Sequence, residues 1–236
     1  MDKIEVIMPC YIVNDKLIEL TKSAIESLGK VFLIIVDNCS PLGGGYLRSK
    51  ADLYIKGTEN KGYAWAVNQG LKLAEGPIIA IANNDVRVSS NWQEAALEVF
   101  KKPKTYSCHF RMTDYDIPFS YGDKIYYTGK ERWCTSSFFV INNKKPFLYD
   151  PKFLNSYCDW DYWERVRSWG YFTAYTNKAC YQHLHSTTIN LLPQHTLNNE
   201  NNKEYFKQKH GEYAEVLFEQ KFPDQMEVPY WEGFNL

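Results

Sequence analysis

Short apolar runs divide the first hundred residues into regularly spaced segments. Lys3–Met8, Val31–Val36 and Ile78–Ala82 have the length and composition of buried strands, and Leu53–Lys56 is a shorter run of the same kind. Val31–Val36 is apolar throughout, which is typical of a parallel strand covered on both faces. We therefore predict four strands in this half of the chain.

Apolar residues at helical spacing fill the stretches between these runs. Asn14 and Asp15 can begin a helix that continues to Leu28, and Gly62–Ala74 and the stretch from Asn91 to Phe100 show the same periodicity. The order strand–helix–strand–strand–helix–strand–helix predicts an α/β fold, a mostly parallel sheet with helices on its faces. Ligands of such sheets bind beyond the carboxyl ends of the strands. The loops after Met8, Val36 and Ala82 should therefore converge on one cleft.

The loop after the second strand has the composition of a long turn. Residues 37–45 read Asp-Asn-Cys-Ser-Pro-Leu-Gly-Gly-Gly, and we expect no regular structure there. The second half of the chain has a mixed pattern and no evident linker. The elements predicted for it are strands at Tyr106–Phe110, Ile125–Tyr127, Trp133–Ile141 and Tyr171–Tyr175, helices at Asp159–Trp169 and Glu204–Phe222, and a polar mobile loop at 186–202.

Composition narrows the class of protein. The chain has 236 residues, 44% of them hydrophobic, and a formal charge of −1, which argues against both disorder and a strongly cationic nucleic-acid binder. Aromatic residues make up 16% of the chain. Such a share fits ordinary core packing as well as a groove that stacks flat ligands, and composition does not choose between them.

Targeting signals and cysteine spacing point to the cytoplasm. The apolar run at the N-terminus is too short for a signal peptide, and no stretch reaches the roughly 20 apolar residues of a membrane span. We therefore expect a soluble, cytoplasmic protein without a transmembrane anchor. The six cysteines are scattered without a CxxC pair, which predicts free thiols and disfavours a structural zinc site.

Asp85 follows the buried run Ile78–Ala82, in the sequence Asn83-Asn84-Asp85. Asn and Asp are favoured in turns, so one interpretation is purely local. The other is a carboxylate at the carboxyl edge of the sheet that holds Mg²⁺ or Mn²⁺ on a diphosphate.

Two carboxylates occur in the first turn of the predicted helix at Asp159–Trp169. Asp159 and Asp161 can simply complement the helix dipole. Because aromatic residues and Cys158 flank them, a second interpretation is a partly desolvated Asp with a raised pKa that acts as a general base.

Two further polar groups follow predicted elements. His183 and His185 are two residues apart near a strand end, so they either reach one metal site together or lie on the surface. Asn60, Lys61 and Gly62 precede a helix whose N-terminus is a possible phosphate site.

Taken in order, these segments resemble the family 2 glycosyltransferases of the GT-A fold, in particular the group that includes rhamnosyltransferases. The resemblance covers roughly residues 4–188 and rests on six motifs. They are Pro9-Cys10-Tyr11 after the first strand, Val36-Asp37-Asn38 after the second, Asn60-Lys61-Gly62 with Asn68 and Gly70, Asn83-Asn84-Asp85, Asp159-Trp160-Asp161 with Arg165, and His183.

The resemblance implies roles for these residues. Asp159 would be the catalytic base that deprotonates the acceptor, and Asp85 and His183 would bind the Mn²⁺ or Mg²⁺ ion. Asp37 would recognise the nucleobase. The other residues implied on the donor side are Pro9, Tyr11, Asn60, Lys61, Gly62, Asn68, Asn83 and Asn84, and those on the acceptor side or in support are Trp160, Asp161, Arg165 and His185.

The sequence departs from the family pattern at two positions. Cys158 stands where an acidic residue precedes the catalytic Asp, which bears on the type of acceptor. Asn83 stands at the first position of the DxD-type motif, which bears on metal affinity.

The function implied is an inverting, metal-dependent transfer of sugar from a UDP- or dTDP-sugar to a hydroxyl of a glycan, a protein or a modified nucleobase. Residues 1–188 would form the catalytic domain, with a nucleotide-sugar half (1–105) and an acceptor half (106–188). Residues 189–236 would pack on it as a tail, a lid or a homodimer contact. Two alternatives are a sugar-1-phosphate nucleotidyltransferase and a non-catalytic module that binds nucleotide sugars or glycans.

Overall fold

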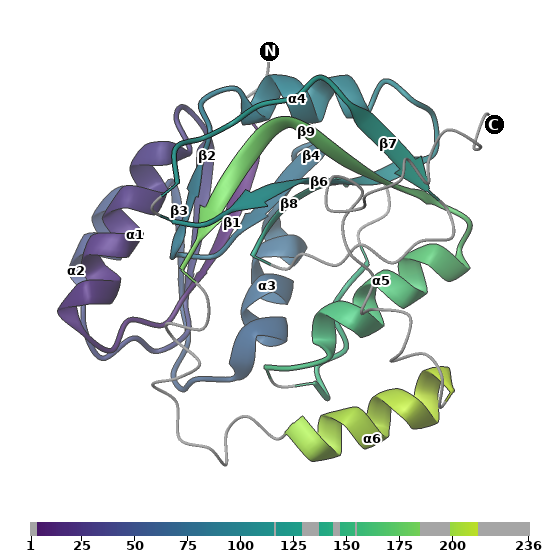
Figure 1. Ribbon diagram of the computed structural model, residues 1–236. Coiled ribbons are helices and arrows are strands. Elements are labelled where there is room, and N and C mark those ends of the chain that lie inside the picture. The colour runs from purple at the N-terminus through teal and green to yellow at the C-terminus, as the bar shows by residue number, and fades with distance from the viewer. Residues whose placement is uncertain are drawn as a thin grey trace.

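The computed structural model describes residues 4–115, 117–128, 137–143, 147–153, 155–184 and 199–211. These residues form one mixed sheet with helices on both faces (Figure 1). The strands are β1 (Glu5–Cys10), β2 (Phe32–Asp37), β3 (Leu53–Lys56), β4 (Ile78–Ala82), β5 (Val86–Val88), β6 (Thr105–Thr113), β7 (Ile125–Thr128), β8 (Phe138–Asn142) and β9 (Phe172–His183). The helices are α1 (Asp15–Ser27), α2 (Gly44–Lys50), α3 (Gly62–Leu73), α4 (Trp92–Val99), α5 (Cys158–Ser168) and α6 (Asn199–His210).

The strands lie in the order β3-β2-β1-β4-β8-β6-β9-β5, and β7 pairs with β9. β3, β2, β1 and β4 are parallel, which confirms the predicted α/β architecture. β8 is antiparallel to both β4 and β6, and β9 is parallel to β6. Consequently β6 and β9 run in the same direction as β4, and their carboxyl ends lie at the edge of the sheet where β1, β2 and β4 end.

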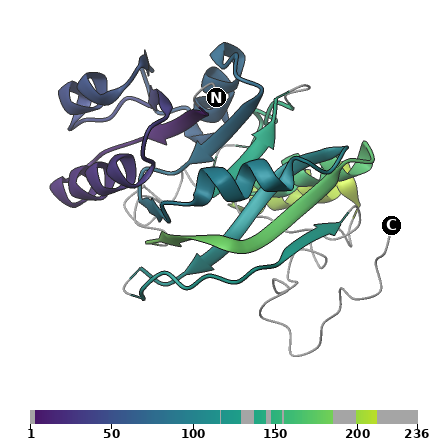
Figure 2. The ribbon, with the colours of Figure 1, turned by 90° about the horizontal axis from the view of Figure 1, so that it is seen from above.

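Two hydrophobic cores lie on the two faces of the sheet. Helices α1, α2 and α4 cover one face, where Leu17, Leu47 and Trp92 are buried against the strands. Helices α3, α5 and α6 cover the other face, where Tyr162 and Phe206 are buried. Seen from above, α4 lies over the sheet beside β9 (Figure 2). Burial of strands on both faces explains why the β1, β2 and β4 segments are apolar almost throughout.

Two elements in the first half were not predicted. Helix α2 begins at Gly44, so the expected loop over residues 37–45 is wrong for its last two residues. The glycines hide this helix because they are weak helix formers. Strand β5 has only three residues, too few for a recognisable alternation, and it forms because it pairs with β9 on the far side of the sheet.

Strand β9 is much longer than the predicted strand Tyr171–Tyr175. It continues to His183, past a register shift against β6 at Phe110 and Arg111. The polar pair Asn177-Lys178 falls at this irregularity, where the side-chain alternation is interrupted, so the sequence pattern ends early. The first strand also extends beyond Met8 to Cys10. Proline lacks an amide hydrogen, but Pro9 is tolerated because the pairing of β1 with β4 ends at Ile7, so Pro9 has a strand neighbour only in β2.

The polar segment at 186–202 is not a loop throughout. Helix α6 begins at Asn199, where Asn202 donates hydrogen bonds to the carbonyl and hydroxyl oxygens of Ser156, at 3.1 and 2.9 Å. The predicted helix Glu204–Phe222 therefore starts earlier than expected, and residues 212–222 lie outside the described residues. The same holds for 185–198, for 133–136 of the predicted strand Trp133–Ile141, and for the C-terminal tail.

Five of the six cysteines are described, and all five are free thiols, as predicted. Cys134 lies outside the described residues. Within the described part of the chain, no helix is long and apolar enough to span a bilayer.

Candidate active site

The carboxyl ends of β1 and β2 meet as predicted. Cys10 pairs with Asp37 in the parallel ladder, and the Asn38 amide donates to the Cys10 carbonyl at 2.8 Å. Burial raises the pKa of the Cys10 thiol, and the negative charges of Asp37 and Asp85 raise it further. Asp37 and Asp85 therefore lie on two sides of Cys10, and this part of the sheet edge gathers two of the predicted carboxylates.

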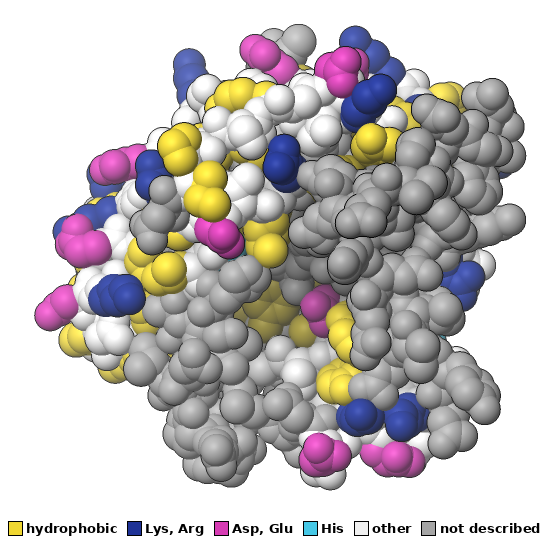
Figure 3. Space-filling view, in the orientation of Figure 1, with side chains coloured by type: hydrophobic (Ala, Val, Ile, Leu, Met, Phe, Trp, Pro, Cys, Tyr) yellow, Lys and Arg dark blue, Asp and Glu magenta, His cyan; other side chains and the backbone are white. Residues whose placement is uncertain are grey.

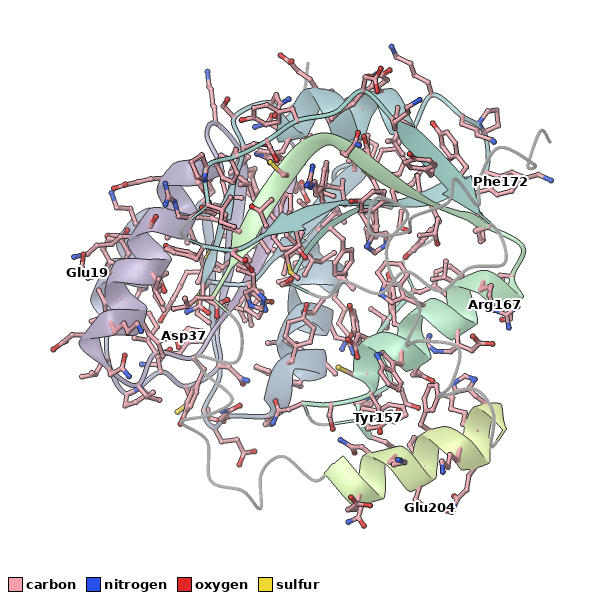
Figure 4. All side chains as sticks on the ribbon, in the orientation of Figure 1. Glu19, Asp37, Tyr157, Arg167, Phe172 and Glu204 are labelled. Atoms are coloured by element: carbon pink, nitrogen blue, oxygen red, sulfur yellow. The ribbon has the colours of Figure 1, made fainter. Side chains whose placement is uncertain are left out.

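Asp37, labelled in Figure 4, is fully buried at the end of β2. Its carboxylate accepts hydrogen bonds from the Ser40 amide at 2.7 Å and from the Tyr54 hydroxyl at 2.5 Å. Burial, followed by the bond to Asp37, raises the pKa of Tyr54 well above its usual value. Asp37 thus holds the loop after β2 in place through Ser40.

Pro9 is buried within β1, and the half-buried Tyr11 is the first residue after this strand.

Asn38 connects this loop to the start of α3, a role that was not predicted. Its amide nitrogen donates to Asn60 Oδ1 at 2.7 Å and to the Gly62 carbonyl at 3.1 Å, and its Oδ1 accepts from the Lys61 amide at 3.0 Å. The only signal in the sequence was its position directly after the predicted base-recognising Asp37. Cys39, next in the chain, has a φ of 66°, so the turn is held in a strained left-handed conformation.

Three backbone amides at the start of α3 are engaged within the protein. The amides of Lys61, Gly62 and Tyr63 donate to side-chain oxygens of Asn38, Asn60 and Asn155, respectively.

Gly62 has a φ of 83°, which explains why glycine occupies this position. The exposed Lys61 ammonium lies 3.4 Å from Glu59 and 5.6 Å from the centre of the Trp65 ring. A role of Lys61 in donor binding therefore rests on its side chain.

Asn68 lies in the middle of α3 and is engaged within the protein. Its amide nitrogen donates to the Tyr149 carbonyl at 2.8 Å, and its Oδ1 accepts from the Tyr149 amide at 2.7 Å. Asn68 therefore binds the segment that leads to α5, and its predicted role on the donor side stays a prediction.

Asp85 and His183 come together across the junction of β5 and β9. Val86 pairs with His183, which places His183 Nε2 3.2 Å from Asp85 Oδ1. Only 6% of the Asp85 side chain and 12% of the His183 side chain are exposed. This pair matches the predicted metal ligands. His185 lies outside the described residues.

Asn83 and Asn84 flank the same turn in different ways. The Asn83 amide donates to the Ser137 carbonyl at 2.7 Å, and Asn83 Oδ1 is buried without a hydrogen-bond donor among the described residues. Asn84 is buried and its side chain donates to Thr21 Oγ1 at 3.0 Å, which ties the turn to α1. Asn84 therefore supports the turn, while Asn83 keeps an unsatisfied oxygen beside Asp85.

The residues of this turn fit a divalent cation. Asn83 Oδ1 is a buried oxygen that accepts no hydrogen bond from the described residues, and such an acceptor is costly without a partner. Asp85 Oδ1 is buried as well and has the His183 imidazole as its neighbour, at 3.2 Å. Carboxylate oxygen and imidazole nitrogen are ligands suited to Mn²⁺. Within the described residues, however, no group of three or more His, Cys, Asp or Glu side chains gathers at one point. The protein thus offers a partial ligand set, to which a diphosphate would add its own oxygens.

Asp159 lies in the first turn of α5, next to the start of α3. Its Oδ1 accepts from the Trp160 amide at 3.0 Å. Burial raises the pKa of Tyr63 and Tyr149, and the charge of Asp159 contributes to both increases, so the carboxylate lies close to these two phenols. Tyr157, labelled in Figure 4, has a φ of 62° and directs the chain into the helix from a strained conformation.

Asp161 has a different environment from Asp159. It is fully buried, and its carboxylate contacts Arg165 Nε at 2.9 Å, Lys209 Nζ at 2.6 Å and His210 Nε2 at 2.9 Å. Burial would raise the pKa of Asp161, but the hydrogen bond of His210 and the positive charges of Arg165 and Lys209 outweigh it and lower the pKa. Arg165 also donates to the Leu148 carbonyl at 2.8 Å. These contacts are those of a structural support that fastens α6 to α5.

Trp160 packs within the same support. Its ring lies 4.9 Å from the Tyr157 ring and 6.0 Å from the buried Phe206 ring of α6, both edge to face. Sequence analysis alone had no signal for the contribution of α6.

The space-filling view shows a recess on this side of the molecule, with hydrophobic and acidic side chains at its wall (Figure 3).

Residues 5–157 match the model of the glycosyl transferase family 2. The chain therefore belongs to this family and is a glycosyltransferase. The match ends just before Asp159 and does not reach His183. No curated protein sequence matches the chain.

Solved structures of glycosyltransferases have a similar fold. TarS 1-349 from S. aureus has a TM-score of 0.62 and 13% identity, over 89% of this chain and 74% of that one. GalNAc-T7 with UDP, GalNAc and Mn²⁺ has a TM-score of 0.62 and 12% identity, over 78% of this chain and 44% of that one. The mannosyltransferase PcManGT from Pyrobaculum calidifontis, with GDP-Man and Mn²⁺, has a TM-score of 0.62 and 16% identity, over 94% of this chain and 66% of that one. This chain thus spans less than half of GalNAc-T7, about two thirds of PcManGT and about three quarters of TarS 1-349.

Proposed function

We propose that the protein transfers a sugar from a nucleoside diphosphate sugar to an acceptor hydroxyl, with inversion at the anomeric carbon. The observation that most supports this proposal is the pair Asp85–His183, a carboxylate and an imidazole 3.2 Å apart and largely shielded from solvent at the carboxyl edge of the sheet. Similar folds are known with UDP or GDP-Man and with Mn²⁺. We propose a UDP- or dTDP-sugar as donor.

Asp85 and His183 would hold the Mn²⁺ or Mg²⁺ ion, with Asn83 Oδ1 beside them. The ion would neutralise negative charge on the departing diphosphate. The half-buried Tyr11 would line the side of the pocket that receives the base, and the buried Asp37 would order the loop beside it through Ser40 and Tyr54. Lys61 would add a positive charge near the start of α3.

Asp159 would take the proton from the acceptor hydroxyl. The carboxylate lies at the start of α5, where the helix dipole and the Trp160 amide hold it in place. A base on one side of the sugar and a leaving diphosphate on the other is the arrangement of a single displacement, which inverts the anomeric centre. Holding both substrates in line would make the reaction effectively unimolecular and so lower its barrier.

Donor binding tests the proposal directly. UDP-glucose, UDP-N-acetylglucosamine, dTDP-rhamnose and GDP-mannose are titrated by calorimetry with Mn²⁺ and again with EDTA. We expect at least one donor to bind, and to bind at least about tenfold more weakly without the metal, which corresponds to 1.4 kcal/mol. Asp85→Asn should remove the dependence on metal.

The control variant is Asp123→Asn, since Asp123 is an exposed carboxylate outside this site. It should bind like the parent chain. Release of nucleoside diphosphate with Mn²⁺ then reports turnover, and the anomeric configuration of the product, measured by NMR, reports inversion. Absence of binding for every nucleotide sugar would contradict the proposal.

A further inference from the structure

A hollow of about 360 Å³ lies beside the junction of β5 and β9. It is separate from the contacts that hold Asp37, Asp85 and Asp159. Its lining residues come from β5, from β9 and from the segment that follows β6, and they are Arg87, Tyr115, Ile117, Pro118, Phe119 and Gln182.

The hollow lies at the same edge of the sheet as the candidate active site. Thr113, the last residue of β6, pairs with Gln182, and Arg87 pairs with Gln182 from the other side. Arg87 follows Asp85 by two residues, and Gln182 directly precedes His183. Arg87 and Gln182 thus lie within two residues of a proposed metal ligand along the chain, and because strand side chains alternate, they face the side of the β5–β9 pair opposite to His183.

Arg87 gives the hollow a positive charge. Its side chain is exposed, and its guanidinium carbon lies 5.5 Å from the centre of the Tyr115 ring. Among the residues that the structure describes, no carboxylate lies within ion-pair distance of Arg87. The guanidinium therefore lies over an aromatic ring, on a side chain that is exposed to solvent.

The walls of the hollow are held in place by Gln182. This side chain is 4% exposed, and its Nε2 donates to the carbonyl of Ile117. Pro118 restricts the same segment because its ring fixes φ. The half-buried rings of Tyr115 and Phe119 line this open hollow next to the charge.

We propose that this hollow binds an anionic saccharide, in which a carboxylate or phosphate group is recognised by Arg87 and the sugar ring lies against Tyr115 and Phe119. The inference rests on the proposed function and specifies its acceptor as a negatively charged glycan. An Arg fork matches carboxylate and phosphate oxygens in pairs, and aromatic faces cover the apolar side of a sugar. The volume suits a small ligand rather than an extended polymer.

NMR titration of the full chain tests this proposal. The probes are methyl β-glucuronide and glucose 6-phosphate, and methyl β-glucoside is the neutral control. We expect at least one anionic sugar to bind about tenfold more tightly than the glucoside, as for a hydrogen bond to a charged group. Comparison of the two anionic probes tells a carboxylate site from a phosphate site.

Arg87→Met should abolish the preference for the anionic sugar while nucleotide binding stays unchanged. Lys102→Met is the matched control, because the Lys102 ammonium also lies over an aromatic ring, 4.3 Å from the centre of Tyr127, but on another part of the molecule. This control should keep the full preference. Tyr115→Leu should weaken both the anionic and the neutral sugar.

Equal affinity for charged and neutral sugars would overturn the proposal, and so would a preference that survives Arg87→Met. These outcomes are independent of the proposed function, because the titration requires neither a donor nor turnover. If nucleotide sugars bind and anionic sugars do not, the transferase assignment stands and this acceptor site falls. If anionic sugars bind through Arg87 and no nucleotide sugar does, the hollow is a glycan site and the transfer proposal falls.

Discussion

Asp159 and Asp161 are two residues apart and have opposite surroundings. Asp161 is surrounded by Arg165, Lys209 and His210, whereas Asp159 accepts a hydrogen bond from its own helix and lies near Tyr63. A carboxylate neutralised by three basic side chains is a poor proton acceptor, because its pKa is lowered. Of the two, Asp159 is the one suited to act as a base.

We predict that Asp159→Asn lowers the rate of sugar transfer by about 10²- to 10⁴-fold, the usual contribution of a general base. Asparagine keeps an oxygen for the Trp160 amide, so the helix start and donor affinity should not change. Transfer rates and donor titrations on the same preparation measure the two effects. Full turnover by this variant would contradict the assignment, and Asp123→Asn again serves as control.

His109 makes the stability of the protein depend on pH. It is fully buried between the rings of Phe139 and Trp163, and burial lowers its pKa to about 3. The folded chain therefore keeps His109 neutral between pH 6.5 and 3, while the unfolded chain binds a proton there. Stability should fall by about 1.4 kcal/mol for each pH unit below 6.5, until pH approaches 3.

His109→Phe should remove this dependence, because phenylalanine fits among the same aromatic rings and cannot take a proton. The free energy of unfolding is measured by denaturant titration at pH 7.5, 6.5, 5.5 and 4.5. We expect the variant to gain on the parent chain steadily below pH 6.5. Parallel pH profiles for the two proteins would exclude His109 as the cause.

Residue types predicted some of the contacts at the candidate site and not others. Asp85 and His183 were predicted as one metal site, and the structure brings them within 3.2 Å. Asn68 was placed on the donor side, yet it binds the Tyr149 backbone, because nothing in a single sequence shows which backbone segment lies opposite a helix. Asn38 was overlooked for the same reason, since its three partners lie in a different loop.

At the scale of elements, the approach of α3 to β1 depends on Gly70. A β-carbon at this position would lie 2.5 Å from Ile7 Cγ2, much closer than packing allows. We predict that Gly70→Ala destabilises the fold by about 1–3 kcal/mol, the usual cost of overpacking. Denaturant unfolding of the purified protein measures the change.

Gly45→Ala is the matched substitution in helix α2. A β-carbon there meets no atom within 4 Å, so alanine only restricts the unfolded chain and favours the helix. We expect it to stabilise the protein by about 0.5–1 kcal/mol. If both variants shifted stability in the same direction, close helix–strand contact would not be the reason for Gly70.

The predicted elements were those whose sequence pattern repeats often enough to be recognised. β3 and β4 have the predicted bounds, and α3 begins at the predicted Gly62. Asn91 precedes α4 as predicted, but its side chain donates to the Lys178 carbonyl of β9 rather than capping the helix. β5 escaped prediction because three residues carry no period, and it exists only through its pairing with a strand from the other half of the chain.

At the scale of the whole molecule, the two halves of the chain share one sheet. β4 of the first half pairs with β8, and β5 pairs with β9 at the opposite edge of the second half. We therefore predict that residues 1–105 alone do not form a stable fold, because β4 would lose its pairing with β8 and β5 its pairing with β9.

Circular dichroism and amide hydrogen exchange on this fragment, next to the full chain, test the prediction. The full chain should unfold in a single transition, with β4 and β9 amides protected to a similar extent. A fragment that unfolds cooperatively by itself would show that the first half is an independent domain.

The pairing of β5 with β9 also determines when, during synthesis of the chain, the two proposed metal ligands can come together. Asp85 leaves the ribosome early, together with the four parallel strands, but His183 is added only when nearly the whole described chain has been synthesised. N-terminal segments begin to fold during synthesis, so a nascent chain can assemble its first strands around Asp37 before it has a complete metal pair. The growing polypeptide would thus not acquire its proposed catalytic metal site until the final strand of the sheet has joined the edge.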